Sequence, residues 1–120
     1  MTTSYAIDGQ HRLVVSRGWG VVTDEELFDH YMRLRSDPAF DPTYRQLIEL
    51  REVLRFDTGP DAVEVVAALH VFSPGVRRAI VASTAEAHGR ARRFAILAER
   101  QDQLIEVFDT AQAALDWLDG

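Results

Sequence analysis

The stretch RQLIELREVLRFDTGPDAVEVV, residues 45–66, decides the fold class of this chain. Residues 46–50 are mostly large and apolar, which predicts a buried central strand. A connector follows, and we expect its apolar residues to be packed: Val53, Leu54 and Phe56. An Asp-Thr-Gly-Pro turn comes next, at residues 57–60. Open α/β sheets bind ligands at such turns, beyond the carboxyl ends of their strands.

The turn leads into a predicted helix from about residue 61 to residue 72. Its apolar residues lie nearly all round the helix, and they are Val63, Val65, Val66, Leu69, Val71 and Phe72. A helix of this kind is buried on several sides or lies at an interface. We therefore expect His70 to be packed, and the pattern slightly favours a homodimer over a monomer.

The N-terminal part predicts a hairpin followed by a helix. Residues 4–15 contain two short apolar strands around Asp8-Gly9, a favoured hairpin turn pair. The two glycines that flank Trp19 are expected to bulge or bend the end of the second strand. Thr23 and Glu26 then form a predicted capping box, in which the Thr hydroxyl accepts a hydrogen bond from the Glu26 amide.

The C-terminal half continues the alternation of strand and helix. Strands are predicted at residues 76–82 and 104–108, and helices after the capping sequences Ser83-Thr84-Ala85-Glu86 and Asp109-Thr110. The order β-β-α-β-α-β-α-β-α predicts an α/β fold with a mostly parallel five-stranded sheet, an N-terminal antiparallel hairpin and four helices. We assign residues 1–120 to a single domain.

Composition restricts the compartment and the partners. The chain has 120 residues, 47% of them apolar, which suffices for one core. It has no cysteine, which excludes disulfides and thiolate chemistry and fits the reducing cytoplasm in which we expect the protein. A net charge of −6 repels phosphate backbones, so nucleic acid is not an expected partner. Neither a signal peptide nor a membrane-spanning run is predicted.

Charged residues give few signals of catalysis. Every basic residue is arginine, which excludes Schiff-base and P-loop lysines. Arg77-Arg78 forms a local basic spot, and Arg90, Arg92 and Arg93 are interpreted as a solvated helix face. Glu49 lies in the central strand and is interpreted as half of an ion pair, with Arg51 or Arg12 as the other half.

The histidines show no spacing typical of metal ligands, and they are His11, His30, His70 and His88. The sequence also lacks the motifs of nucleophilic hydrolases, dinucleotide-binding proteins and zinc proteases. We therefore predict no metal, no cofactor and no enzymatic activity.

Three segments, in this order and spacing, resemble the STAS family, and most closely its SpoIIAA-like branch of bacterial anti-sigma-factor antagonists. They are LIELREV (47–53) with FDTG (56–59), PGVRRAIV (74–81), and VFDT (107–110) with AALDWL (113–118). The resemblance covers nearly the whole chain. It implies a STAS-like fold and a non-catalytic regulatory function exerted on a protein partner, such as a kinase or an anti-sigma-like protein.

The same resemblance singles out Thr58. In antagonists of this family the loop reads Asp-Ser-Ser-Gly, and a partner kinase phosphorylates one of the serines. Here the loop is Asp-Thr-Gly, one hydroxyl residue shorter, so the resemblance implies phosphorylation at Thr58 alone. From the residues themselves, Thr58 is interpreted first as a helix N-cap, and Asp57 as a turn former.

Short polar segments follow each predicted parallel strand. Their residues are Thr23, Asp57, Thr58, Gly59, Ser83, Thr84, Asp109 and Thr110. Because parallel strands end at one edge of a sheet, these residues are expected to gather there and to form a candidate binding loop cluster. The alternative is that four helices each need a cap.

Two functions remain open, with an enzyme as the least favoured third. The first is a regulatory interaction module, controlled at Thr58. The second is a carrier or sensor of a small nonpolar molecule, indicated by the apolar segment at residues 63–72 and by aromatic residues in or near loops, Trp19, Phe40 and Phe56. The branch that the chain resembles is also thought to hold nonpolar ligands in a groove.

Overall fold

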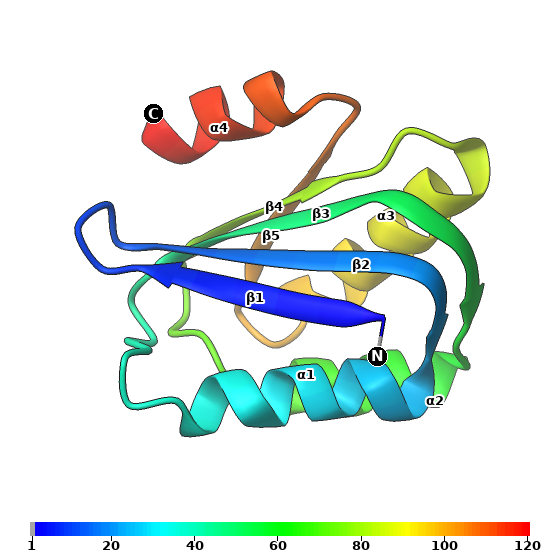
Figure 1. Cartoon of the computed structure of the whole chain (residues 1–120), viewed down its shortest axis with the longest axis horizontal. Coiled ribbons are helices and arrows are strands. Elements are labelled where there is room, and N and C mark those ends of the chain that lie inside the picture. The colour runs from blue at the N-terminus through cyan, green and yellow to red at the C-terminus, as the bar shows by residue number, and fades with distance from the viewer. Residues whose placement is uncertain (1) are drawn as a thin grey trace.

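The computed structural model describes residues 2–120, and all of their side chains except those of Pro60 and Val63. The strands are β1 (Thr3–Asp8), β2 (Leu13–Thr23), β3 (Arg45–Asp57), β4 (Arg77–Val81) and β5 (Leu104–Phe108). The helices are α1 (Asp24–Ser36), α2 (Pro60–Ala68), α3 (Ala85–Glu99) and α4 (Ala111–Asp119). This order confirms the predicted β-β-α-β-α-β-α-β-α fold (Figure 1).

The five strands form one sheet in the order β1-β2-β3-β4-β5. β1 is antiparallel to β2 at one edge, and β2 to β5 are parallel, as predicted. Successive right-handed crossovers that advance in one direction place their helices on one face of a sheet. α1, α2 and α3 accordingly lie on one face, whereas α4 follows the last strand and covers the other (Figure 1).

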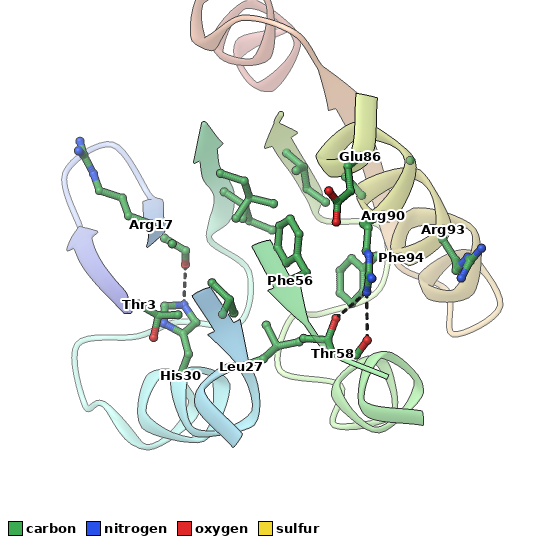
Figure 2. A pocket seen from close by; sticks show the side chains of 18 of the residues that line it. Thr3, Arg17, Leu27, His30, Phe56, Thr58, Glu86, Arg90, Arg93 and Phe94 are labelled. Atoms are coloured by element: carbon green, nitrogen blue, oxygen red, sulfur yellow. Dashed lines mark hydrogen bonds between the residues drawn. The ribbon is translucent and has the colours of Figure 1, made fainter. Parts of the chain in front are cut away.

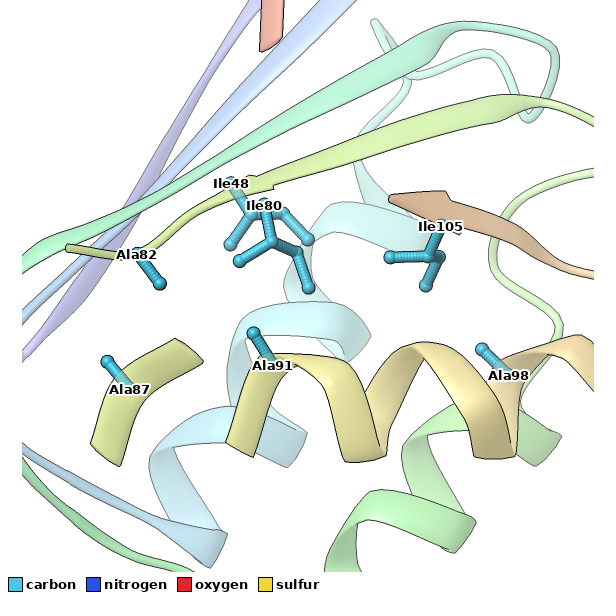
Figure 3. Close-up of a cluster of buried hydrophobic side chains, with 7 residues drawn as sticks. All are labelled: Ile48, Ile80, Ala82, Ala87, Ala91, Ala98 and Ile105. Carbon is cyan, nitrogen blue, oxygen red and sulfur yellow. The ribbon is translucent and has the colours of Figure 1, made fainter. Parts of the chain in front are cut away.

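α3 packs closely on the sheet because its inward face consists of alanines. Ala87, Ala91 and Ala98 are buried against Ile80 and Ile105 (Figure 3). α4 packs on the opposite face through Ala114 and Leu118. Small side chains on a helix let it approach the strands closely. The large apolar residues on both faces of the sheet are then buried away from water.

β2 and β3 are longer than predicted. They pair in parallel from Leu13 and Arg45 to Thr23 and Asp57, so residues 51–57 are strand and the predicted connector is wrong. The register shifts where the bulge is predicted, between Arg17 and Trp19 and again between Gly20 and Val21, but the extra residue at each shift lies on β3 and not on β2. Cross-strand hydrogen bonds therefore continue past the glycines, since a bulge absorbs the extra residue without ending the pairing.

Packing in this extension differs from the expectation in one place. Val53 is buried, but Leu54 is 82% exposed, so its predicted packing is wrong. The two residues point to opposite faces, because side chains alternate along a strand.

α2 ends four residues earlier than predicted, at Ala68. His70 has a positive φ of 49°, which ends the helical path, and its side chain is exposed rather than packed. Val71 and Phe72 are still buried, in the segment after the helix. Within α2, Val66 faces the core and Val65 is half exposed. The expectation for the Val63 side chain falls outside the described residues.

Three of the helices begin with a threonine cap. Thr23, Thr84 and Thr110 each accept a hydrogen bond from the backbone amide three residues later. The cap of α3 is therefore Thr84 and not Ser83. The N-cap residue of α2 is Gly59, which has no side chain to bond the first turn, so the interpretation of Thr58 as an N-cap is wrong.

No helix within residues 2–120 is long and apolar enough to cross a membrane.

Candidate functional site

A cavity of about 570 Å³ lies between the sheet and helices α1 and α3 (Figure 2). Its apolar walls come from β2, β3, β4 and both helices, and they include Val22, Leu27, Ile48, Leu50, Phe56, Ile80 and Phe94. The exposed lining residues Glu86, Gly89 and Arg90 mark where the cavity opens to solvent. A space of this size and composition suits a small organic molecule.

The cavity exists because small residues stand where larger side chains would fill the gap. Gly18, Gly59, Ala85, Gly89 and Ala91 all line it. α2 packs against α1 and α3 and so bridges the two helices that form the cavity walls. α1 and α3 are each fixed to the sheet by separate clusters of buried side chains. Neither helix can therefore move inward to fill the space between them.

A row of buried polar side chains crosses the sheet behind the cavity. Ser16 on β2, Gln46 on β3 and Arg78 on β4 all face the side of α1 and α3. The Gln46 amide nitrogen donates to Ser16 Oγ at 2.9 Å, and the Arg78 Nε donates to Gln46 Oε1 at 2.9 Å. Burial of such groups costs little only when they bond one another, as these do.

Arg78 is the charged member of this row and is only 4% exposed. It also donates to Gln103 Oε1 at 3.2 Å and to the Tyr31 hydroxyl at 3.2 Å. Its guanidinium lies 4.5 Å from the centre of the Phe72 ring. Burial lowers the pKa of Arg78 from its ordinary value, and the bond to Tyr31 opposes this shift. Neutral acceptors and aromatic faces, rather than a carboxylate, thus hold this cation in the core.

His30, on α1, lies at the edge of the cavity and is 4% exposed. Its Nε2 lies 3.0 Å from Ser16 Oγ. Burial, with a smaller contribution from the Arg33 charge, lowers the pKa of His30 to about 4, so the ring is neutral at neutral pH. Its Nδ1 has no hydrogen-bond partner among the described residues, and neither does Oγ1 of the buried Thr3.

Both orphaned atoms belong to residues that line the cavity. Figure 2 draws Thr3 and His30 at the same end of it, beside the dashed bond from His30 to Ser16. The two atoms themselves have less than 1 Å² of accessible surface, so protein encloses them, and each costs free energy as a buried polar atom without a partner.

Thr58 lies at the other end of the cavity, after the last residue of β3. Arg90 on α3 donates to the Thr58 carbonyl at 3.0 Å and to its hydroxyl at 3.2 Å (Figure 2). The next amide, that of Gly59, donates to Asp24 Oδ1 at 2.9 Å. The Thr58–Gly59 segment is thereby bonded both to α3 and to the first turn of α1, the two helices that enclose the cavity.

Comparison with solved structures finds the same architecture elsewhere. An uncharacterized protein of the DUF3478 family from Shewanella loihica, described as having a SpoIIAA-like fold, superposes with a TM-score of 0.64. The superposition covers 98% of this chain and 94% of that one, at 18% sequence identity. The chain has a SpoIIAA-like fold. The predicted likeness to the SpoIIAA-like branch is therefore confirmed for the fold.

Comparison of the sequence alone finds no counterpart: no protein-family model matches the chain, and no curated protein does. At 18% identity this likeness shows the fold alone, because one fold hosts many functions, which depend on the residues of the site.

The SpoIIAA-like fold places the predicted binding-loop residues at the carboxyl ends of parallel strands. Thr23, Asp57, Ser83, Thr84 and Asp109 follow or end β2 to β5, and Thr110 caps α4. Of the predicted cluster, only Thr58 and Gly59 are among the described residues that line the cavity.

The other predicted residues make separate contacts. Asp109 forms an ion pair with His88 at 3.3 Å. Glu49 forms an ion pair with Arg51 at 2.8 Å, and Arg51 is one of the two partners expected. Burial raises the pKa of Glu49, but the hydrogen bonds and the charge of Arg51 outweigh it, so the pKa is lowered. Of the three aromatic residues noted in the sequence, Phe56 lines the cavity, whereas Phe40 packs on Phe72.

The buried polar row is not among the predicted site residues. The sequence predicts Arg78 as part of a local basic spot, but the structure encloses it in the core. The available signal was a polar residue at an inward position of each strand, Ser16 after Val14 on β2 and Gln46 before Ile48 on β3. Residues 2–120 contain no cluster of three or more His, Cys, Asp or Glu side chains that could hold a metal ion.

Proposed function

We propose that this protein is a non-catalytic binding module that holds a small nonpolar molecule in the cavity between α1 and α3. The observation that carries the proposal is the cavity itself, with about 570 Å³ of space and walls of Leu27, Ile48, Ile80 and Phe94. Transfer of an apolar molecule from water into such a space is favourable because it removes apolar surface from water.

The one Ser–His contact among the described residues that line the cavity lacks the features of a catalytic pair, which supports non-catalytic binding. Ser16 and His30 are 3.0 Å apart, but a nucleophile and its base need a third group to orient the base. The other ring nitrogen of His30 has no such partner among the described residues. A pKa of about 4 also makes His30 a weak base at neutral pH.

Gly89 offers a direct test of the cavity. It lies on α3 at the cavity opening, and a Cβ added there meets nothing within 4 Å. We expect Gly89→Leu to fill the opening and to weaken binding of the uncharged fluorescent probe N-phenyl-1-naphthylamine roughly tenfold or more. The protein should stay folded, because replacing a helix-interior glycine favours the helix by about 0.5–1 kcal/mol.

Gly89→Ala is the matched control, since it makes the same backbone change with one methyl group. It should bind the probe as the wild type does, with a single saturable site in a fluorescence titration. Absence of saturable binding to the wild type, or equal binding by Gly89→Leu, would overturn the proposed function.

A second candidate function, control of a protein contact by phosphorylation at Thr58, is supported by the Arg90 contacts. We propose that a partner kinase modifies this hydroxyl, which already accepts a hydrogen bond from Arg90 at 3.2 Å. A phosphate there has a guanidinium beside it and the start of α2 two residues on, and both favour an anion. Asp57 and Asp61 lie close in sequence and oppose it.

The test is peptide mapping by mass spectrometry of protein purified from its own cells with phosphatase inhibitors present. We expect a phosphoryl group on Thr58 and loss of that modification in Thr58→Val, which keeps the shape of the side chain. The Thr58→Glu variant should change binding of the partner relative to wild type. An unmodified Thr58 peptide, with Thr58→Glu and wild type indistinguishable in partner binding, would contradict this candidate.

A further inference from the structure

The charged residues that line the cavity differ in overall sign from the chain as a whole. Among the described lining residues Arg17, Arg90 and Arg93 are basic and Glu86 is acidic, whereas the whole chain carries a net charge of −6. All four side chains are exposed, so they lie at the rim of the cavity and not among its apolar walls. A positive rim on an acidic protein attracts small anions to the cavity opening.

Arg90 is the basic residue that the structure holds in place at this opening. Its Nη1 donates to the carbonyl oxygen of Thr58 at 3.0 Å and to the Thr58 hydroxyl at 3.2 Å. The guanidinium therefore reaches from α3 to the segment that follows β3, whereas Figure 2 shows the side chains of Arg17 and Arg93 pointing away from the cavity. Of the three arginines, Arg90 is thus the one placed to touch a bound molecule.

The bonds to Thr58 use one of the three nitrogens of the Arg90 guanidinium. Nε and Nη2 have no hydrogen-bond partner among the described residues. These two nitrogens form the side of the guanidinium that binds both oxygens of a carboxylate, as Arg51 does with Glu49 in this chain. Thr58 therefore fixes Arg90 with a carboxylate-binding side left open.

We propose that the molecule held in the cavity carries one carboxylate, which binds Arg90 at the opening while its apolar body lies against Ile48, Ile80 and Phe94. The inference rests on the proposed function and names the chemical class of the ligand, a small organic monocarboxylate. The apolar body supplies most of the buried area, and the charged group fixes which end of the molecule faces solvent.

The opening suits a charged group better than the apolar interior does. A carboxylate buried against the walls would lose its hydration without a bonded cation, which is costly, whereas one beside the exposed Arg90 keeps part of its water. Glu86, one turn before Arg90 on α3, opposes an anion. Arg17 and Arg93 add positive charge at the same rim, so the balance of charge there still favours an anion.

The ligands 1-naphthylacetate and 1-naphthylacetamide test the inference, because they share nearly the same shape and differ in charge. The dissociation constant of each is measured by displacement of N-phenyl-1-naphthylamine at neutral pH and low ionic strength. In wild type we expect the carboxylate to bind roughly fivefold more tightly than the amide. Added salt should bring the ratio of the two constants towards one, because the charges are exposed.

Arg90→Gln is the decisive variant, because it removes the charge and keeps an amide that can donate to Thr58. We expect it to abolish most of the preference for the carboxylate and to leave binding of the amide unchanged within about twofold. Arg92→Gln is the matched control, since it removes the same charge from an exposed residue of α3 that is not among the described lining residues. It should keep the preference of wild type.

The outcomes separate the inference from the proposed function. If N-phenyl-1-naphthylamine binds but the carboxylate has no advantage over the amide, or neither ligand displaces the probe, the inference is overturned while the proposed function stands. The same holds if Arg90→Gln keeps the preference or Arg92→Gln loses it equally. If the probe itself shows no saturable binding to wild type, both are overturned.

Discussion

Replacing Arg78 by lysine is expected to lower the free energy of unfolding by about 3 kcal/mol, although the charge is kept. The guanidinium bonds three separate acceptors, on Gln46, Gln103 and Tyr31, and lies over the Phe72 ring. A lysine ammonium is a point donor on a shorter reach and cannot serve all three. The acceptors that it leaves are buried, and each unpaired buried acceptor costs roughly 1–3 kcal/mol.

Urea unfolding at neutral pH measures this effect, and Arg92→Lys is the matched control. Arg92 lies exposed on α3, so its substitution should change the unfolding free energy by less than about 0.5 kcal/mol. An Arg78→Lys protein as stable as the wild type would show that the three bonds contribute nothing to the core.

The second large effect is a loss of stability in mild acid caused by His30. Its pKa is about 4 in the folded protein and 6.5 in an unfolded chain. The unfolded state therefore binds more protons between these two values, so the unfolding free energy falls as pH decreases from about 6.5 towards 4. Above about pH 6.5 the full contribution is present. Between about pH 7.5 and pH 5 we expect a loss of about 2 kcal/mol from this residue.

His30→Gln isolates the contribution, because glutamine does not titrate. Its unfolding free energy should be flatter than that of wild type over the same pH range, whatever its absolute stability. Carboxylates whose pKa values hydrogen bonds hold low, such as Asp37 and Asp41, act in both proteins and cancel in the comparison. Equal pH dependence in the two proteins would contradict the burial of a neutral His30.

The element order could be predicted from the sequence because strong local signals mark each boundary. Thr23 and Thr110 cap helices as predicted. The predicted hairpin forms, but its turn is displaced, because Asp8 is the last residue of β1 and pairs with Leu13, which leaves residues 9–12 as the loop. The extent of β2 and β3 could not be predicted in this way. Residues 51–57 have no clear apolar run, and they become strand because the extended β2 supplies hydrogen-bond partners for them.

The candidate site was harder to predict than the fold. The Asp57–Gly59 turn is at the expected edge, and Thr58 does line the cavity. The cavity itself is lined by small residues from segments far apart in the sequence, such as Gly18 on β2 and Gly89 on α3, and no local pattern reveals that they share one space. Arg78 illustrates the same limit, since its burial follows from partners on β3, α1 and the segment before β5.

The most direct test of nonpolar binding in the cavity is a methyl ¹H–¹³C spectrum of the wild type, recorded during titration with N-phenyl-1-naphthylamine. If the probe binds in the cavity, we expect saturable shifts of the methyl groups of Leu27, Ile48 and Ile80, which line it, at one probe per chain. The methyl groups of Ala114 and Leu118, on the buried side of α4 at the opposite face of the sheet, should not shift. Shifts confined to the exposed Leu54 and Ile96, or no saturable shift at all, would contradict it.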